Sequence, residues 1–179
     1  MNTFLALCMF TCFMSCHPGK MVIIEPGSDS TLLARVDKPH TFEGVPAIFN
    51  FIFSEKSRNL YDSNGKTWLL FDDPLITEKP DGVYEIYVSD RSPNTISLNS
   101  TSRDFVNVLD LYSITAPGAG QVIEVDISSH LKNIYAQKHQ LPNIYVTLVF
   151  SGNLDTNGRQ SKNAGKLQLG GIRLLQTKR

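Results

Sequence analysis

Phe49, Phe51 and Phe53 are separated by single residues, so an extended backbone places the three rings on the same side of the chain. Ile48 and Ile52 then lie on the opposite side. A β-strand has this period of two, whereas a helix would scatter the rings around its axis. The segment therefore predicts a strand that buries at least one face.

Similar short apolar runs, bounded by Gly, Pro, Asn and Asp, recur along the rest of the chain. In one of them Tyr84, Ile86 and Val88 share a face, and in another Phe105, Leu109 and Leu111 are expected to do so. Strands are predicted at residues 32–36, 47–53, 68–71, 83–88, 105–111, 121–127, 144–150, 166–169 and 172–175.

Turn residues connect these runs. Asn64-Gly65 predicts a type I′ hairpin turn before the strand at 68–71, because both central residues of that turn need positive φ. Gly170-Gly171 predicts a bulge or bend within one continuous edge strand over residues 166–175.

One helix is predicted at residues 129–137, where Leu131, Ile134 and Tyr135 have helical spacing and Ser128 or Ser129 could cap the N-terminus. With about eight or nine short strands and this single short helix, the predicted fold class is all-β: an antiparallel, jelly-roll-like β-sandwich.

Length and composition bound the domain organisation. The chain has 179 residues, of which 41% are hydrophobic, enough for one domain with a real core. Lys plus Arg and Asp plus Glu both number 17, and no basic stripe stands out. Electrostatic binding of nucleic acid needs such a stripe, so no nucleic-acid partner is expected.

The first fifteen residues carry no charge and are followed by Ser15-Cys16, which resembles the lipobox of bacterial lipoproteins. Lipidation at Cys16 is therefore predicted, with a signal peptide at 1–16, a tether at 17–30 and a β-sandwich domain at 31–179. The segment departs from the usual lipoprotein signal at two points. It has no Lys or Arg near the start, and Phe13 stands where Leu is commoner. An ordinary signal peptide and a buried first element stay open as alternatives.

The predicted location is the bacterial cell envelope, with the exported domain held at a membrane by its lipid anchor. All three cysteines, Cys8, Cys12 and Cys16, lie in the N-terminal segment. After cleavage before Cys16 the domain would have no disulfide framework and no thiolate metal site.

No motif in the sequence points to a self-contained catalytic or metal site. His17, His40, His130 and His139 form no i, i+3 or i, i+4 pair, and no nucleophile elbow, phosphate loop or dinucleotide fingerprint occurs. Two segments, 62–65 and 155–158, resemble the opening of a calcium loop but lack its closing acid, and both suit turns. We therefore expect no catalytic residue, no metal and no cofactor.

Two sets of side chains leave other functions open. Several acids lie near predicted strand ends, but no acid–base pair can be chosen among them: Asp72, Asp73, Asp81, Glu85, Asp90 and Asp104. An aromatic platform for sugars could be formed by Tyr61, Trp68, Tyr87 and Tyr112, although aromatic side chains on sandwich strands usually belong to the core.

Several segments resemble, in order, the C-terminal domain of plant polyphenol oxidases and of some bacterial tyrosinase proteins. Val83-Tyr84-Glu85-Ile86-Tyr87-Val88 resembles its Lys-Phe-Asp-Val-type strand, with Val83 replacing the lysine, and Phe105-Val106-Asn107-Val108 matches the next strand. Segments 127–131, 144–149 and 165–174 resemble that domain's closing helix, Val-Thr-Leu-Val strand and terminal Gly-Gly-Ile strand. The match covers about half of the chain, from Gly82 to Leu175.

The resemblance implies a sandwich that packs over the dicopper site of a separate catalytic domain and shields it. That catalytic domain supplies six histidines in two sets of three, whereas this chain has four scattered ones. The resemblance therefore implies a non-catalytic cap or chaperone with a copper oxidase as its protein partner. A carbohydrate- or ligand-binding jelly-roll lipoprotein is the alternative, and an enzyme with unassigned acids is the third reading.

Overall fold

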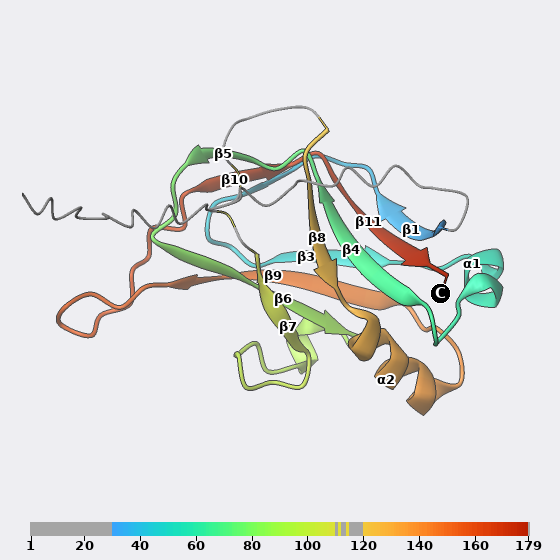
Figure 1. Ribbon diagram of the computed structural model, residues 1–179. Helices are drawn as coiled ribbons and strands as arrows, with labels where there is room; N and C mark the ends of the chain where they lie inside the picture. The colour runs from blue at the N-terminus through green and yellow to red at the C-terminus, as the bar shows by residue number, and fades with distance from the viewer. Residues whose placement is uncertain (1–29, 110, 112–113, 115–119, 179) are drawn as a thin grey trace, which may run out of the picture.

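The computed structural model describes residues 30–109, 111, 114 and 120–178. The predicted signal peptide, the lipidation site Cys16 and almost all of the tether lie outside these residues. Within them the fold is mainly antiparallel β-sheet in a sandwich-like arrangement, which confirms the predicted all-β class (Figure 1).

Sheet A has four antiparallel strands. Its order is β1 (Ser30–Val36), β11 (Gly171–Thr177), β4 (Lys66–Asp72) and β8 (Val122–Asp126). Sheet B has three strands in the order β2 (His40–Phe42), β10 (Lys166–Leu169) and β5 (Leu75–Glu78). Because β4 leads into β5 and β10 into β11, the two sheets form one bent layer.

The bend lies at Asp73 and Gly170. Asp73 has a φ of 48°, a left-handed conformation that breaks the strand between β4 and β5. On the neighbouring strand the Gly170 amide donates to the Asp72 carbonyl at 2.8 Å, and a Cβ at Gly170 would lie 3.1 Å from the Asp73 Cβ. A larger residue at position 170 would therefore crowd the bend.

Sheet C forms the second layer, which crosses the middle of Figure 1 below the other two sheets. Its order is β3 (Ala47–Phe51), β9 (Ile144–Gly152), β6 (Gly82–Ser89) and β7 (Phe105–Leu109). The core between the layers contains Phe49, Ile86 and Leu148 from sheet C and Leu69 and Leu174 from sheet A, all at most 2% exposed. The alternation predicted for residues 47–53 is confirmed.

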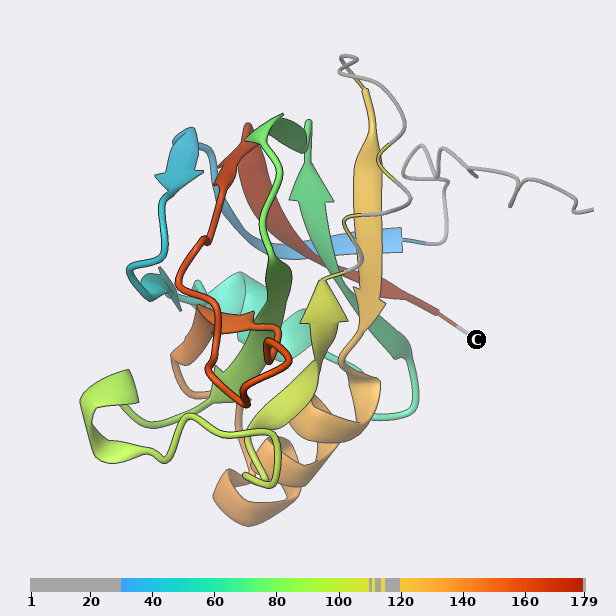
Figure 2. The same cartoon turned by 90° about the vertical axis from the view of Figure 1, so that its left-hand side faces the viewer.

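Helices lie at one end of the sandwich. α1 (Glu55–Leu60) follows β3, the 3₁₀ turn η1 (Pro93–Thr95) lies in the loop between β6 and β7, and α2 (Ser128–Lys138) follows β8. α2 buries Leu131 completely, as its predicted spacing requires. In Figures 1 and 2 the β6–β7 loop and α2 lie on the same lower side of the molecule.

Several sequence-based expectations were wrong in detail. β2, β5 and α1 were not predicted from the sequence, because the two strands are very short and α1 has no buried residue to give it an apolar period. Instead, α1 begins at the N-cap Ser54, whose hydroxyl accepts from the Ser57 amide at 3.1 Å. Residues 166–175 are not one edge strand, because both β10 and β11 lie between two other strands.

The predicted hairpin turn at Asn64-Gly65 also differs. It joins α1 to β4, and neither residue has positive φ. The Asp62 side chain accepts from the Asn64 amide at 2.8 Å and so closes the turn without the type I′ geometry. Neither predicted serine caps α2, whose N-cap is Ile127; the Ser128 hydroxyl accepts from the Thr67 amide instead.

A bulge separates the two halves of β7. The pairing shifts between Ile86 and Tyr87, so that Leu109 lies opposite Tyr84 but Phe105 lies opposite Tyr87. Phe105 packs against the Tyr87 ring at 5.7 Å, whereas Leu109 joins the core. Phe105 and Leu109 therefore do not share a face, contrary to the uninterrupted alternation predicted for this strand.

Candidate functional site

The acids named from the sequence are dispersed, and most contact a specific partner. Asp72 binds Arg173, Glu85 accepts from the Tyr87 hydroxyl, and Asp81 accepts from the Asn153 side chain at 3.3 Å. Burial and the hydrogen bond to Glu85 raise the pKa of Tyr87. These acids form no common catalytic centre.

Asp90 and Asp104 both line one cavity, which we call the α2 pocket. Its volume is about 300 Å³, and it lies between the β6–β7 connection and α2. It is lined by Val88, Asp90, Arg103, Asp104, His130, Asn133, Ile134, Ala136 and Gln137.

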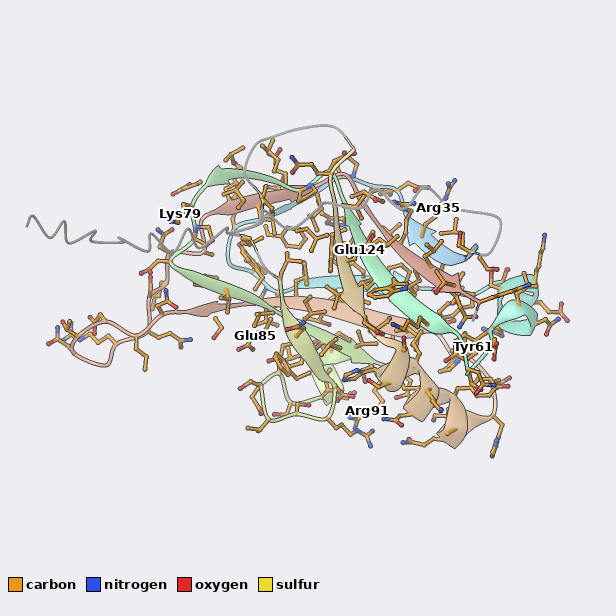
Figure 3. The ribbon with its side chains drawn as sticks, viewed as in Figure 1. Arg35, Tyr61, Lys79, Glu85, Arg91 and Glu124 are labelled. Carbon is orange, nitrogen blue, oxygen red and sulfur yellow. The ribbon has the colours of Figure 1, made fainter. Side chains whose placement is uncertain are left out.

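The charges in and around the α2 pocket compensate one another. Asp104 is 7% exposed and accepts from Arg91 Nη2 at 3.0 Å, with Arg103 Nε at 3.9 Å. Asp90 pairs with Lys138 at 3.4 Å. Figure 3 shows Arg91 near the loop that lines this region. Both carboxylates therefore serve as anchors for cations and are poorly placed as free general bases.

His130 is held by the backbone. Its Nε2 lies 2.9 Å from the Phe105 carbonyl oxygen, which can only accept, so Nε2 carries the proton. The Ser129 hydroxyl lies 3.5 Å from Nδ1. This contact ties the start of β7 to α2 and gives His130 a structural role.

A second cavity, the α1–α2 cleft, lies where the ends of the two helices meet. It is open and has a volume of about 630 Å³. Its lining residues are Glu55, Arg58, Asn59, Tyr61, Tyr135, His139, Gln140 and Leu141. Of the residues considered from the sequence for a sugar platform, Tyr61 lines this cleft, and Figure 3 shows it between α1 and α2.

Tyr61 and Tyr135 form the aromatic wall of the α1–α2 cleft. Their ring centroids are 5.2 Å apart at an interplanar angle of 49°. Burial, then the neighbouring Tyr135 and Asp62, raise the pKa of Tyr61 to about 12, so its hydroxyl stays protonated at neutral pH. At the edge of the cleft, His139 ends α2 with a φ of 58°, where glycine is the usual residue.

Among the described residues, Tyr61, Trp68 and Tyr87 do not form a shared aromatic platform. Tyr87 is fully buried, Trp68 lies on β4 with the Lys66 ammonium 5.6 Å from its ring centroid, and Tyr112 lies outside the described residues. From the sequence, Tyr135 was expected only to lie on the apolar face of the helix at 129–137. The loop before β4 brings Tyr61 to it, which no local pattern indicates.

A third feature is the outer face of sheet C, the side opposite the core. Two rows of paired residues cross it: Ile48, Thr147, Tyr87 and Phe105 form one, and Val149, Glu85 and Val108 form the other. Ile48 is 47% exposed and Val108 is 38% exposed, at the two edge strands. Apolar side chains therefore reach solvent at both edges of this face, whereas the central Thr147 and Tyr87 are buried.

Among the described residues, no group of three or more His, Cys, Asp or Glu side chains could hold a metal ion. The two calcium-like segments act as turns: Asp155 Oδ1 accepts from the amides of Asn157 and Arg159, both at 2.8 Å. His40 packs its ring against Phe49 at 4.7 Å, and His17 lies outside the described part of the chain.

Within the described ranges, none of the helices has both the length and the apolar character needed to cross a membrane. In comparisons with known proteins, no family model matches the chain. No curated protein matches it either.

Proposed function

We propose that this chain is an exported, lipid-anchored and non-catalytic binding module whose sheet C outer face binds a protein partner. The exposed Ile48 and Val108 on that face are the observation that carries the proposal. A sheet that covers a core on one side and faces water on the other normally alternates apolar and polar residues.

Sheet C departs from this alternation. Ile48, Val149 and Val108 all occupy positions on its outer side, and the central Thr147 and Tyr87 are almost inaccessible to water. A protein partner that covers this face would remove the exposed apolar side chains of Ile48 and Val108 from water, which is favourable.

The resemblance to the C-terminal domain of polyphenol oxidases suggests the first partner to test, a tyrosinase-type copper enzyme. The segments that carry the resemblance include β6, β7 and β9, which are three of the four strands of sheet C. Covering or chaperoning such an enzyme requires a shaped surface and no catalytic group in this chain. The pairing of Asp90 and Asp104 with cations fits this role.

Site-specific photo-crosslinking in the native cell tests the proposal. A photoreactive residue at position 48 should capture a defined partner, and the same residue at position 154 should not. Leu154 is the matched control because it is 71% exposed but lies in the loop after β9, away from the sheet C outer face. Ile48→Glu should abolish capture from position 108, and Leu154→Glu should leave it intact.

Equal capture from positions 48 and 154, or none from either, would refute the binding face. A partner captured from position 48 that has no copper-binding histidine sets would retain the face and refute the copper-enzyme assignment. A carbohydrate ligand is the second candidate function, and the α1–α2 cleft favours it for the reasons below.

A further inference from the structure

The α1–α2 cleft, unlike the α2 pocket, has a wall of two tyrosine rings beside polar groups. Five of its eight lining residues are charged, amide or imidazole side chains, and Tyr61 and Tyr135 supply the wall. Both rings are partly buried and pack against the hydrophobic core, so their positions are set by the fold. Preformed sites combine such a rigid apolar surface with a few polar groups that orient the ligand.

The charge of the cleft limits the ligand class. Glu55 balances Arg58, both on α1, so the lining offers no clear surplus of cations for a phosphate or of carboxylates for a metal ion. The polar character of the lining also disfavours an acyl chain. A neutral, hydroxyl-rich ring meets both conditions, because its C–H face packs on an aromatic ring and its hydroxyls bond to amides and carboxylates.

The α2 terminus places an additional polar group at the cleft. His139 keeps a left-handed backbone conformation that side chains with a Cβ adopt at a cost, and its amide donates to the Tyr135 carbonyl at 2.7 Å. This geometry ends the helix directly after the turn that carries Tyr135. It leaves His139 and Gln140 exposed at the edge of the cleft.

We propose that the α1–α2 cleft is a saccharide-binding site, in which a pyranose ring packs against Tyr135 and Tyr61 and its hydroxyls bond to Glu55, Asn59 and Gln140. The proposal does not depend on the protein partner of the sheet C outer face, because the two surfaces share no residue. It adds a second binding function to the same domain.

Titration of the full chain with defined oligosaccharides tests this site. The probes are the hexaoses of β-1,4-glucose, β-1,4-xylose, β-1,4-mannose, β-1,3-glucose and β-1,4-N-acetylglucosamine, and binding is followed by calorimetry. At least one probe should bind with a Kd on the order of 1 mM or tighter. Tyr135→Ala should weaken that binding at least about tenfold, whereas Tyr145→Ala, a partly exposed tyrosine of sheet C, should not change it.

Tyr135 also packs against the core, so its removal could affect folding. Gln140→Ala and His139→Gly change exposed side chains and leave the core intact, and Gln140→Ala should weaken binding about threefold or more. Ile48→Glu should leave saccharide binding unchanged, which separates this test from that of the protein partner. Absence of heat from every probe at about 10 mM, or binding unaffected by both Tyr135→Ala and Gln140→Ala, would overturn the proposal.

Discussion

Arg173 on β11 donates two hydrogen bonds to Asp72 on the neighbouring strand β4, from Nε to Oδ2 at 2.7 Å and from Nη2 to Oδ1 at 2.5 Å. The two side chains are 28% and 21% exposed. The hydrogen bond to Asp72 is the main reason that the pKa of Arg173 is raised. This bidentate ion pair links the two central strands of sheet A next to the bend at Asp73.

Replacing Arg173 by Met should therefore destabilise the protein by about 1–3 kcal/mol, because Asp72 would lose both charge-assisted bonds while partly buried. Arg173→Lys should recover only part of the loss, since an ammonium cannot reproduce the planar fork. Urea denaturation gives both values. Arg35→Met is the control: its pair with Asp37 is about 60% exposed on both sides, and the loss should stay under about 0.5 kcal/mol.

Leu148 tests the central position of β9. It is 1% exposed and lies between Ala47 on β3 and Ile86 on β6. Leu148→Ala should reduce the free energy of unfolding by about 2–4 kcal/mol through lost burial and a residual cavity. Leu154→Ala, at an exposed loop position, should change it by less than about 0.5 kcal/mol. Similar small losses at both positions would contradict the sheet order described above.

The strands themselves could be predicted from the sequence because their signal is local. Tyr84, Ile86 and Val88 alternate within β6, and each is at most 1% exposed. The bulge in β7 could not be predicted, since it depends on how residues 105 and 107 pair with residues 87 and 86 across the sheet. The alternation of apolar and polar residues along the sequence does not reveal such a shift in pairing.

The candidate sites were less predictable for the same reason. Asp90 and Asp104 were named from the sequence, but the cations that pair with them were not. Lys138, which pairs with Asp90, comes from the end of α2, and Arg91, which pairs with Asp104, comes from a loop that has no periodic pattern. Tyr61 and Tyr135 are far apart in sequence and meet only because α1 and α2 end on the same side of the sandwich. Long-range packing places these groups, whereas propensity and periodicity report on neighbours.

Removing the hydroxyl of Thr147 should increase the stability of the protein. It is 1% exposed, and among the described residues its Oγ1 has no hydrogen-bond partner. Thr147→Val keeps the shape and removes a buried unsatisfied group, so it should stabilise the protein by about 1 kcal/mol. Thr67→Val is the matched control, because Thr67 Oγ1 accepts from Gln176 Nε2 at 3.2 Å and the change should destabilise. Thermal unfolding of both variants shows whether the first change raises the stability and the second lowers it.

The raised pKa of Tyr61 predicts a stability difference at high pH. The folded state holds this proton up to about pH 12, whereas a tyrosine in the unfolded chain releases it near its ordinary pKa of 10.0. The wild type therefore binds more protons when folded and loses stability as the pH rises through this window. Tyr61→Phe should lose less, by no more than about 2 kcal/mol after allowance for solvent.

Urea denaturation of the wild type and Tyr61→Phe at intervals from pH 9 to about pH 12 measures the difference. Tyr84 and Tyr87 also have raised pKa values, but they are present in both proteins and cancel in the comparison. A constant difference across the whole range would show that Tyr61 titrates alike in both states.

Lipidation at Cys16 stays a prediction of the sequence, based on Ser15-Cys16 and the uncharged apolar run before it. Mass spectrometry of the mature protein should find an acylated Cys16 at its N-terminus. Cys16→Ala should move the protein from the membrane to the soluble fraction, whereas Cys12→Ala should not. A mature protein that retains residues 1–15 would refute the lipoprotein assignment.

The position of β10 and β11 within the layers has a consequence for the timing of folding. β10 lies between β2 and β5, and β11 lies between β1 and β4, so residues 166–177 complete both halves of the bent layer. A nascent chain that lacks them has no strand between β2 and β5 or between β1 and β4, so the bent layer is completed only after residues 166–177 have been synthesised. Late completion of the layer suits the proposed export, because a polypeptide must be threaded through a translocation channel as an extended chain.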